Sequence, residues 1–250
     1  SGYQKWVDDL GAGWWLDFQA NNDVPAENGA EYVHLIWVTQ QKDAAGNYLD
    51  GYNVIPSMGN NSLGYLLQRR PGHTWIVGNE VDRGPDPGQI SGGQGDMKPD
   101  MYAQAYHDIY FYIKKWDPTA LVTPSALVEV TPGRIEYLDM VWDAYQAHYG
   151  GSMPVDLWNM HLYMLPEMRR DGIPSFYANI ALGTNPDLGM LESAVPPILS
   201  ECDPGNNVFC LAEHDSQAEF IAQVVRMRTW MKQHGYQDTP LVITEYSLLL

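Results

Sequence analysis

The strongest constraint on the fold is a pair of apolar, strand-length runs that each end in a glutamate. Residues 74–80 read Thr-Trp-Ile-Val-Gly-Asn-Glu, and residues 241–245 read Leu-Val-Ile-Thr-Glu. Runs this short and this rich in β-branched residues predict buried strands. Because parallel strands of a barrel end on one face, Glu80 and Glu245 are expected to meet there.

The rest of the chain alternates between strand and helix signals. Further strands are predicted over 13–18, 32–38, 121–128 and 155–161, and the main helices over 100–116, 135–145 and 216–235. Residues 40–61 carry turn signals, with 53–56 as a weak strand at most. Strand–helix alternation predicts a parallel sheet, and the count approaches a (β/α)8 TIM barrel, α/β in class.

The length of 250 residues suits one such barrel, and we expect a single catalytic domain over 1–250. An eighth strand is not evident, because only five residues follow Glu245. Either the barrel is incomplete or the sequence is cut from a longer chain. The abrupt apolar ending Leu248-Leu249-Leu250 favours truncation.

The net charge of −17 argues against nucleic acid and against an anionic membrane surface as partners. No apolar run approaches the length of a membrane span. Acidity that keeps the protein soluble is the simplest interpretation, and we expect a monomer. Trp and Tyr, nine and sixteen residues against five Phe, suit either sugar faces or a large core.

Cys202 and Cys210 lie close together in a segment that contains Pro, Gly and Asn. No His or Cys stands beside them at zinc-ligand spacing, so a loop-closing disulfide is favoured over two buried free thiols. A disulfide predicts a secreted or extracellular protein. The start at Ser1-Gly2, without Met, is typical of a processed or engineered terminus and says nothing about export.

Residues 81–99 directly follow Glu80 and hold three Pro and five Gly among nineteen residues. A long loop at the carboxyl end of a barrel strand is where active-site walls are built. A tolerated surface insertion is the alternative.

Gly-Asn-Glu at one strand end, His161-Leu162-Tyr163 two strands later and Thr-Glu-Tyr around Glu245 together resemble clan A of the glycoside hydrolases. The match covers most of the chain in order, and the compact β-1,3-glucanase-like families are the most similar. This resemblance implies a retaining (β/α)8-barrel enzyme that cleaves β-glycosidic bonds of a polysaccharide or oligosaccharide. No cofactor and no metal are implied.

By the same resemblance, Glu80 is the acid/base and Glu245 the nucleophile. Asn79 is expected to hold a sugar hydroxyl, Tyr163 to donate to the nucleophile, and His161 to line the floor or orient a carboxylate. Further candidates for substrate binding, each equally compatible with a core or capping role, are Trp15, Asp17, Trp37 and Tyr246. The Arg that many members carry after the second strand, and the aromatic platform after the eighth, have no evident counterpart here.

Two other functions compete with this hypothesis. A barrel could bind a divalent metal through Glu80, Glu245 and His161, as sugar isomerases do, although such sites usually gather four or more ligands. A non-catalytic glycan-binding protein on a decayed glycosidase scaffold is the other, and the presence of both glutamates argues against decay.

Overall fold

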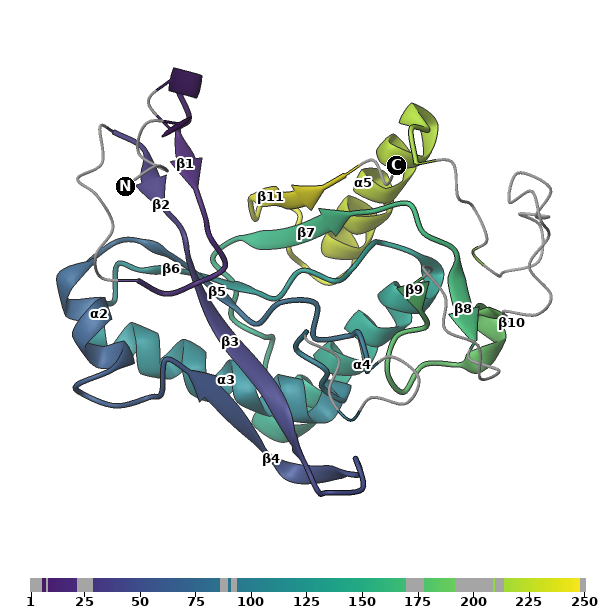
Figure 1. Ribbon diagram of the computed structural model, residues 1–250, viewed down its shortest axis with the longest axis horizontal. Coiled ribbons are helices and arrows are strands. Elements are labelled where there is room, and N and C mark those ends of the chain that lie inside the picture. The colour runs from purple at the N-terminus through teal and green to yellow at the C-terminus, as the bar shows by residue number, and fades with distance from the viewer. Residues whose placement is uncertain are drawn as a thin grey trace.

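The computed structural model describes residues 6–7, 9–21, 29–85, 90, 94–169, 178–191, 209 and 214–247. The chain is a mixed α/β protein whose strands form several open sheets (Figure 1). The largest sheet has the order β4-β3-β5-β6, with bounds β3 His34–Lys42, β4 Tyr48–Ile55, β5 Thr74–Val77 and β6 Leu121–Pro124. Strands β3, β5 and β6 are parallel, as the apolar runs predict.

The prediction of turns over residues 40–61 is wrong for its first part. Strand β3 continues to Lys42, and β4 returns antiparallel to it. In β4 the residues alternate between partly and fully exposed, so the segment lacks the apolar pattern that marks a buried strand. An exposed hairpin arm of this kind is held mainly by its backbone ladder.

Among the described residues, the helices between the strands include α2 Leu63–Arg69, α3 Pro99–Trp116, α4 Pro132–Tyr149 and α5 Gln217–Gln233. Two predicted helix ends are confirmed in chemical detail, whereas α3 begins at Pro99, one residue before its predicted start. Ser216 Oγ accepts a hydrogen bond from the backbone N–H of Glu219 (3.2 Å) at the start of α5. Gly150, at φ +71°, ends α4 in the left-handed conformation that glycine adopts at little cost.

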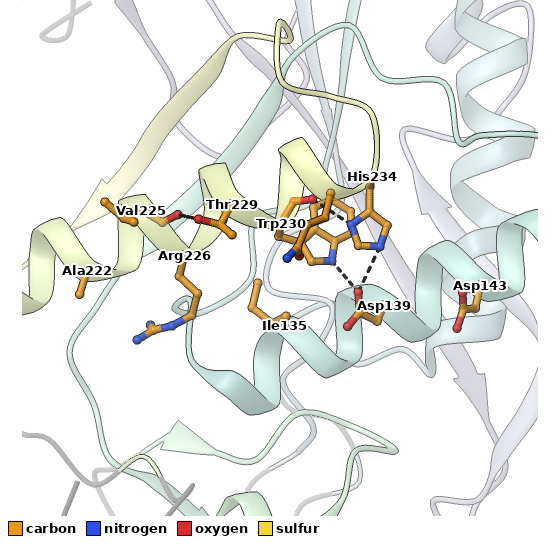
Figure 2. Close-up of a pocket in the computed structure, with 10 residues that line it drawn as sticks. Ile135, Asp139, Asp143, Ala222, Val225, Arg226, Thr229, Trp230 and His234 are labelled. Atoms are coloured by element: carbon orange, nitrogen blue, oxygen red, sulfur yellow. Dashed lines mark hydrogen bonds and ion pairs between the residues drawn. The ribbon is translucent and has the colours of Figure 1, made fainter. Parts of the chain in front are cut away.

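Helices α4 and α5 pack side by side, and Figure 2 shows the groove between them. At its base, the indole N–H of Trp230 donates to Asp139 Oδ1 (2.6 Å), and His234 Nε2 lies 3.4 Å from the same oxygen. The His234 ring stacks on Trp230 with centroids 4.1 Å apart. One carboxylate on α4 therefore fixes the last turn of α5.

The remaining strands form three small sheets, with bounds β1 Trp14–Trp15, β2 Glu31–Tyr32, β7 Trp158–Leu162, β8 Glu167–Arg169, β9 Ala178–Asn179, β10 Met190–Leu191 and β11 Leu241–Tyr246. Strand β1 pairs in parallel with β2, and β7 pairs in parallel with β11. The stretch expected to be irregular, 165–215, holds β8, β9 and β10 as a short sheet near one end of the molecule (Figure 1).

A closed barrel is not found among the described residues, so the (β/α)8 prediction is met only as a mixed α/β arrangement. Strands β6 and β7 belong to different sheets, so no ladder of hydrogen bonds joins them. The Asp156 N–H, just before β7, donates instead to the Val122 carbonyl of β6 (3.1 Å). No described ladder links β11 to β1. Strand β1 is only two residues long, which leaves few backbone groups to close a ring.

The core lies between the central sheet and helices α3 and α4. Trp75 is fully buried on β5, and its ring stacks on His34 with centroids 4.1 Å apart. His34 is the buried core histidine that the sequence predicts. On β7, Trp158 makes edge contacts with Trp230 and Tyr236. These large rings fix β5 and β7 at the positions from which the site residues extend.

Candidate active site

Glu80 stands just past the end of β5, on a backbone that turns sharply. Gly78 has φ +91°, and a Cβ there would lie 2.7 Å from Val81 Cγ1, so only glycine fits. Glu80 itself has φ +43°, a region that a non-glycine residue rarely occupies. Its N–H donates to the Ala126 carbonyl (3.1 Å), which ties the turn to the segment after β6.

Glu245 lies on β11 directly opposite His161 of β7. The parallel register is regular from Leu241 to Ile243 and then shifts by one residue, so that Thr244 is unpaired. A bulge of this kind re-aims the side chains beside it. The Thr244 hydroxyl donates to Asn159 Oδ1 across the two strands and holds the bulge in place.

The structure brings Glu80, His161 and Glu245 together. His161 Nδ1 lies 3.1 Å from Glu80 Oε1, and His161 Nε2 lies 3.0 Å from Glu245 Oε1. One side-chain oxygen of each glutamate lies within 4.8 Å of the other. The side chain of Glu80 is 5% exposed and that of Glu245 is 19% exposed. The imidazole therefore sits between two carboxyl groups, one deeper than the other.

Tyr163 completes the cluster from the residue after β7. Its hydroxyl donates to Glu245 Oε2 (2.8 Å). Burial, then this hydrogen bond and the nearby carboxylates, raise the pKa of Tyr163 above its ordinary value. The phenol therefore keeps its proton and remains a donor to Glu245 through the whole physiological pH range.

The contacts of His161 restrict where protons lie. A neutral imidazole carries one N–H, yet both nitrogens face a side-chain oxygen at about hydrogen-bond distance. Each contact is favourable only when one of its two atoms bears a proton. The imidazole therefore bridges the two glutamates through both of its ring nitrogens.

The same three residues are the set that could hold a metal ion, since each offers one ligand atom within 4.8 Å of the others. A metal would have to take over the ring nitrogen that now faces a glutamate. Three ligands with an open position are typical of catalytic metal sites, which makes this set chemically possible.

The other predicted binding residues make mainly structural contacts. The Asn79 amide donates to Gln94 Oε1 (2.7 Å). Asp17 accepts from the Tyr32 hydroxyl, and the Trp37 indole donates to the Phe18 carbonyl (2.9 Å). The Trp15 ring packs 4.8 Å from that of Tyr32. Tyr246, 74% exposed, is the most open of the set.

The described part of the loop after Glu80 folds back against the strand end. The Gly95 N–H donates to the Asn79 carbonyl (2.9 Å), and the Met97 N–H donates to the Val81 carbonyl (2.8 Å). A Cβ on Gly95 would lie 2.7 Å from Val81 Cα, so the two backbones touch here. These contacts place residues 95–97 beside Glu80.

Sequence reasoning missed a fully buried polar group behind the strand-end loops, made up of Asp82, Glu129, Arg134, Glu167 and Gln223. Asp82 was expected to pair locally with Arg83 or to contact substrate, but it is buried against Arg134 of α4 (2.6 Å). Arg83 instead lies 4.0 Å from Glu80 Oε2. The signal in the sequence that could have indicated this buried group is Arg134, an arginine in the first turn of a helix.

The predicted disulfide cannot be assessed, because Cys202 and Cys210 lie outside the described residues. Within the described ranges, none of the helices has the length and apolar character needed to span a bilayer.

No protein-family model and no curated protein matches the chain. Among solved structures, the chain is similar to a GH128 (subgroup II) endo-beta-1,3-glucanase from Sorangium cellulosum, with a TM-score of 0.42 and 17% identity. The match covers 68% of this chain and 60% of that enzyme, less than two thirds of the enzyme's length. At this TM-score the similarity assigns neither a family nor a function, which must come from the site.

Proposed function

We propose that this protein is a retaining glycoside hydrolase that cleaves β-glycosidic bonds of a polysaccharide or oligosaccharide. One observation carries the proposal: two glutamates follow buried parallel strands with side-chain oxygens within 4.8 Å of each other. Retaining enzymes hold their carboxyl groups about 5–5.5 Å apart, whereas inverting enzymes separate them by about 6.5–9.5 Å to admit a water. Oxygens within 4.8 Å of each other favour the retaining geometry.

The roles of the two glutamates follow from their surroundings. Glu245 accepts the Tyr163 hydrogen bond and also faces His161, so two neighbours orient its carboxylate. Glu80 is the more deeply buried and follows β5 in the Gly-Asn-Glu sequence to which the resemblance assigns the acid/base. We therefore assign Glu80 as acid/base and Glu245 as nucleophile.

In this assignment Glu80 donates its proton to the leaving-group oxygen while Glu245 attacks the anomeric carbon. Water then hydrolyses the glycosyl-enzyme as Glu80 accepts its proton. The His161 ring lies between the two carboxyl groups and contacts one oxygen of each.

The order of the strands supports the clan A assignment. Apart from the separate short sheet of β8, β9 and β10, strands β6 and β7 stand between β5, which precedes Glu80, and β11, which carries Glu245. This separation is the one that the resemblance implies between the fourth and seventh barrel strands. His161-Leu162-Tyr163 lies on and just after β7, next to β11, again as that pattern requires.

A barrel-like arrangement is part of the proposal. A cavity of about 210 Å³ is lined by side chains or backbone from Gly13, Trp14, Glu31, Val33, Thr74, Ile76, Thr123, Leu157, Val242 and Thr244. These residues come from β1, β2, β5, β6 and β11 and from the residues just before β1, β3 and β7. Strands that share one interior are expected to surround a common axis even where their ladders are interrupted. We propose that this unit is one catalytic domain.

The test is a pair of glutamate variants assayed on a panel of β-glucans, xylans, mannans and galactans. Glu245→Ala should abolish turnover, and azide should restore it with an inverted glycosyl azide product. Glu80→Ala should spare aryl glycosides with good leaving groups, since these need no protonation. Glu136→Gln, on the outer helix α4, is the matched control. Wild-type turnover in Glu245→Ala, or binding without turnover by the wild type, would refute the proposal.

The three-ligand geometry of Glu80, His161 and Glu245 favours one other function, a metal-dependent sugar barrel. Activity that is lost on EDTA treatment and restored by a divalent cation would identify it. The glycosidase proposal expects full activity in EDTA.

A further inference from the structure

Arg134 lies at the centre of a buried ionic group behind the candidate site. Its guanidinium is fully buried and donates to both oxygens of Glu167, at 2.7 and 3.1 Å. A third N–H donates to Asp82 Oδ2 (2.6 Å), and a fourth contact reaches the Asn179 carbonyl. Three chain segments thus converge on one side chain, which the rigid five-donor fork of arginine makes possible.

Asp82 connects this group to Glu80. Only Val81 separates the two in the chain, and the Arg83 N–H closes a turn onto the Glu80 carbonyl (3.0 Å). The Asp82 carboxylate also accepts from the Val128 N–H (3.3 Å), and its carbonyl accepts from the Leu182 N–H (3.0 Å). Asp82 is therefore fixed on three sides, immediately after the strained backbone of Glu80.

Stability alone does not explain why this group is buried. Three buried carboxyl groups, from Asp82, Glu129 and Glu167, surround one guanidinium. Among the described residues, Asp82 Oδ1 has no hydrogen-bond partner. Buried ion pairs generally stabilise no better than apolar side chains of the same volume. A group with more carboxyl groups than cations, and with one unsatisfied oxygen, is better explained by the neighbouring residues that it holds in position.

We propose that Arg134 is a positioning residue for Glu80. By clamping Asp82 to α4 and to β8, it holds the turn after β5 so that Glu80 keeps its left-handed backbone and its aim at the leaving-group oxygen. This inference rests on the proposed glycosidase function. It adds a residue that touches neither substrate nor either glutamate of the site.

The mechanism predicts a selective effect. A displaced Glu80 transfers its proton poorly, so glycosides with poor leaving groups suffer, whereas activated aryl glycosides react without that proton. A misplacement of about 1 Å can cost about 100-fold in rate. A purely structural role for Arg134 would instead lower the folded fraction and reduce both rates equally.

The experiment compares Arg134→Lys with wild type on two substrates at a temperature where circular dichroism shows both folded. One substrate is the β-glycan that wild type hydrolyses best, and the other is the 2,4-dinitrophenyl β-glycoside of the same sugar. Lysine keeps the charge but cannot hold Asp82, Glu167 and Asn179 at once. We expect kcat/KM on the glycan to fall about tenfold or more and kcat/KM on the aryl glycoside, which reports the glycosylation step alone, by less than about threefold.

Asp82→Asn serves as the second variant if Arg134→Lys does not fold, because it keeps the shape of the contact while weakening the pair. Arg228→Lys is the control, since that guanidinium caps backbone carbonyls of Gln237 and Thr239 on the outside of the protein. Equal losses on the two substrates in whichever variant folds overturn the inference. If wild type hydrolyses no glycan, the proposed function fails instead, so the two failures are distinguishable.

Discussion

Replacing Glu129 by Gln should make the protein more stable than wild type, by a difference in the free energy of unfolding that grows as the pH rises. Glu129 is fully buried, and its Oε2 accepts the Leu165 N–H (2.9 Å). Its other oxygen has no hydrogen-bond partner in the described part of the chain. Burial first, and then the carboxylate of Glu167, raise the pKa of Glu129 well above its usual range, although Arg134 opposes the shift. The folded protein therefore keeps this proton at pH values where the unfolded chain has lost it.

The sign of the pH dependence follows from that difference. Above the ordinary pKa of a glutamate, about 4.3, the folded state binds one proton more than the unfolded state. The free energy of unfolding then falls by about 1.4 kcal/mol per pH unit for this group. The loss continues until the pH passes the raised pKa of folded Glu129. Gln cannot ionise, and its amide oxygen can still accept the Leu165 N–H, so Glu129→Gln removes this dependence.

The assay is urea unfolding of wild type and Glu129→Gln at intervals from pH 4 to pH 8, with Glu136→Gln as control. The stability difference between Glu129→Gln and wild type should grow with a slope approaching about 1.4 kcal/mol per pH unit, while the control runs parallel to wild type. A flat difference would show that Glu129 is ionised in the folded protein and would refute the reasoning.

Three further predictions concern the site. Tyr163→Phe removes the hydrogen bond to Glu245, worth about 1.5–3 kcal/mol to a charged acceptor, so kcat should fall about 10- to 100-fold; steady-state kinetics measures the fall, and thermal melts establish that the variant is folded at the assay temperature. Gly78→Ala should cost about 1–3 kcal/mol in urea unfolding, because its Cβ would meet Val81 at φ +91°; unchanged stability would mean that the turn is not fixed. Activity should survive dialysis against EDTA, and a loss reversed by a divalent cation would contradict the hydrolase proposal.

The apolar runs were sufficient to predict most of the strands and helices, and the residue order within them was enough to select Glu80, His161, Tyr163 and Glu245. Burial leaves a strong signal in sequence, and strand ends are marked by the return of polar residues. The β3–β4 arm was missed because it is exposed and has no such signal. Its stability comes from backbone hydrogen bonds, which are the same for any sequence.

The buried polar group was invisible for a different reason. Asp82 and Arg134 are 52 residues apart, and Arg134 and Glu167 are 33 apart, so no local pattern connects them. A charged residue in a predicted helix is expected to face solvent, and the first turn of α4 violates that expectation. Gln223 of α5 is similar, since it joins the Val130 N–H to the Tyr163 carbonyl across two distant loops.

The direction of the Glu245 side chain is the feature of the site that the sequence could least predict. Val242 and Thr244 both line the interior cavity, so strict alternation would turn Glu245 outward, away from His161. The shift in register at Thr244 lets two successive residues face the same side, and only then does Glu245 pair with His161. The bulge costs one ladder position and is held by the Thr244 contact with Asn159. The carboxyl spacing that distinguishes retention from inversion therefore depends on a backbone irregularity as much as on the two glutamates.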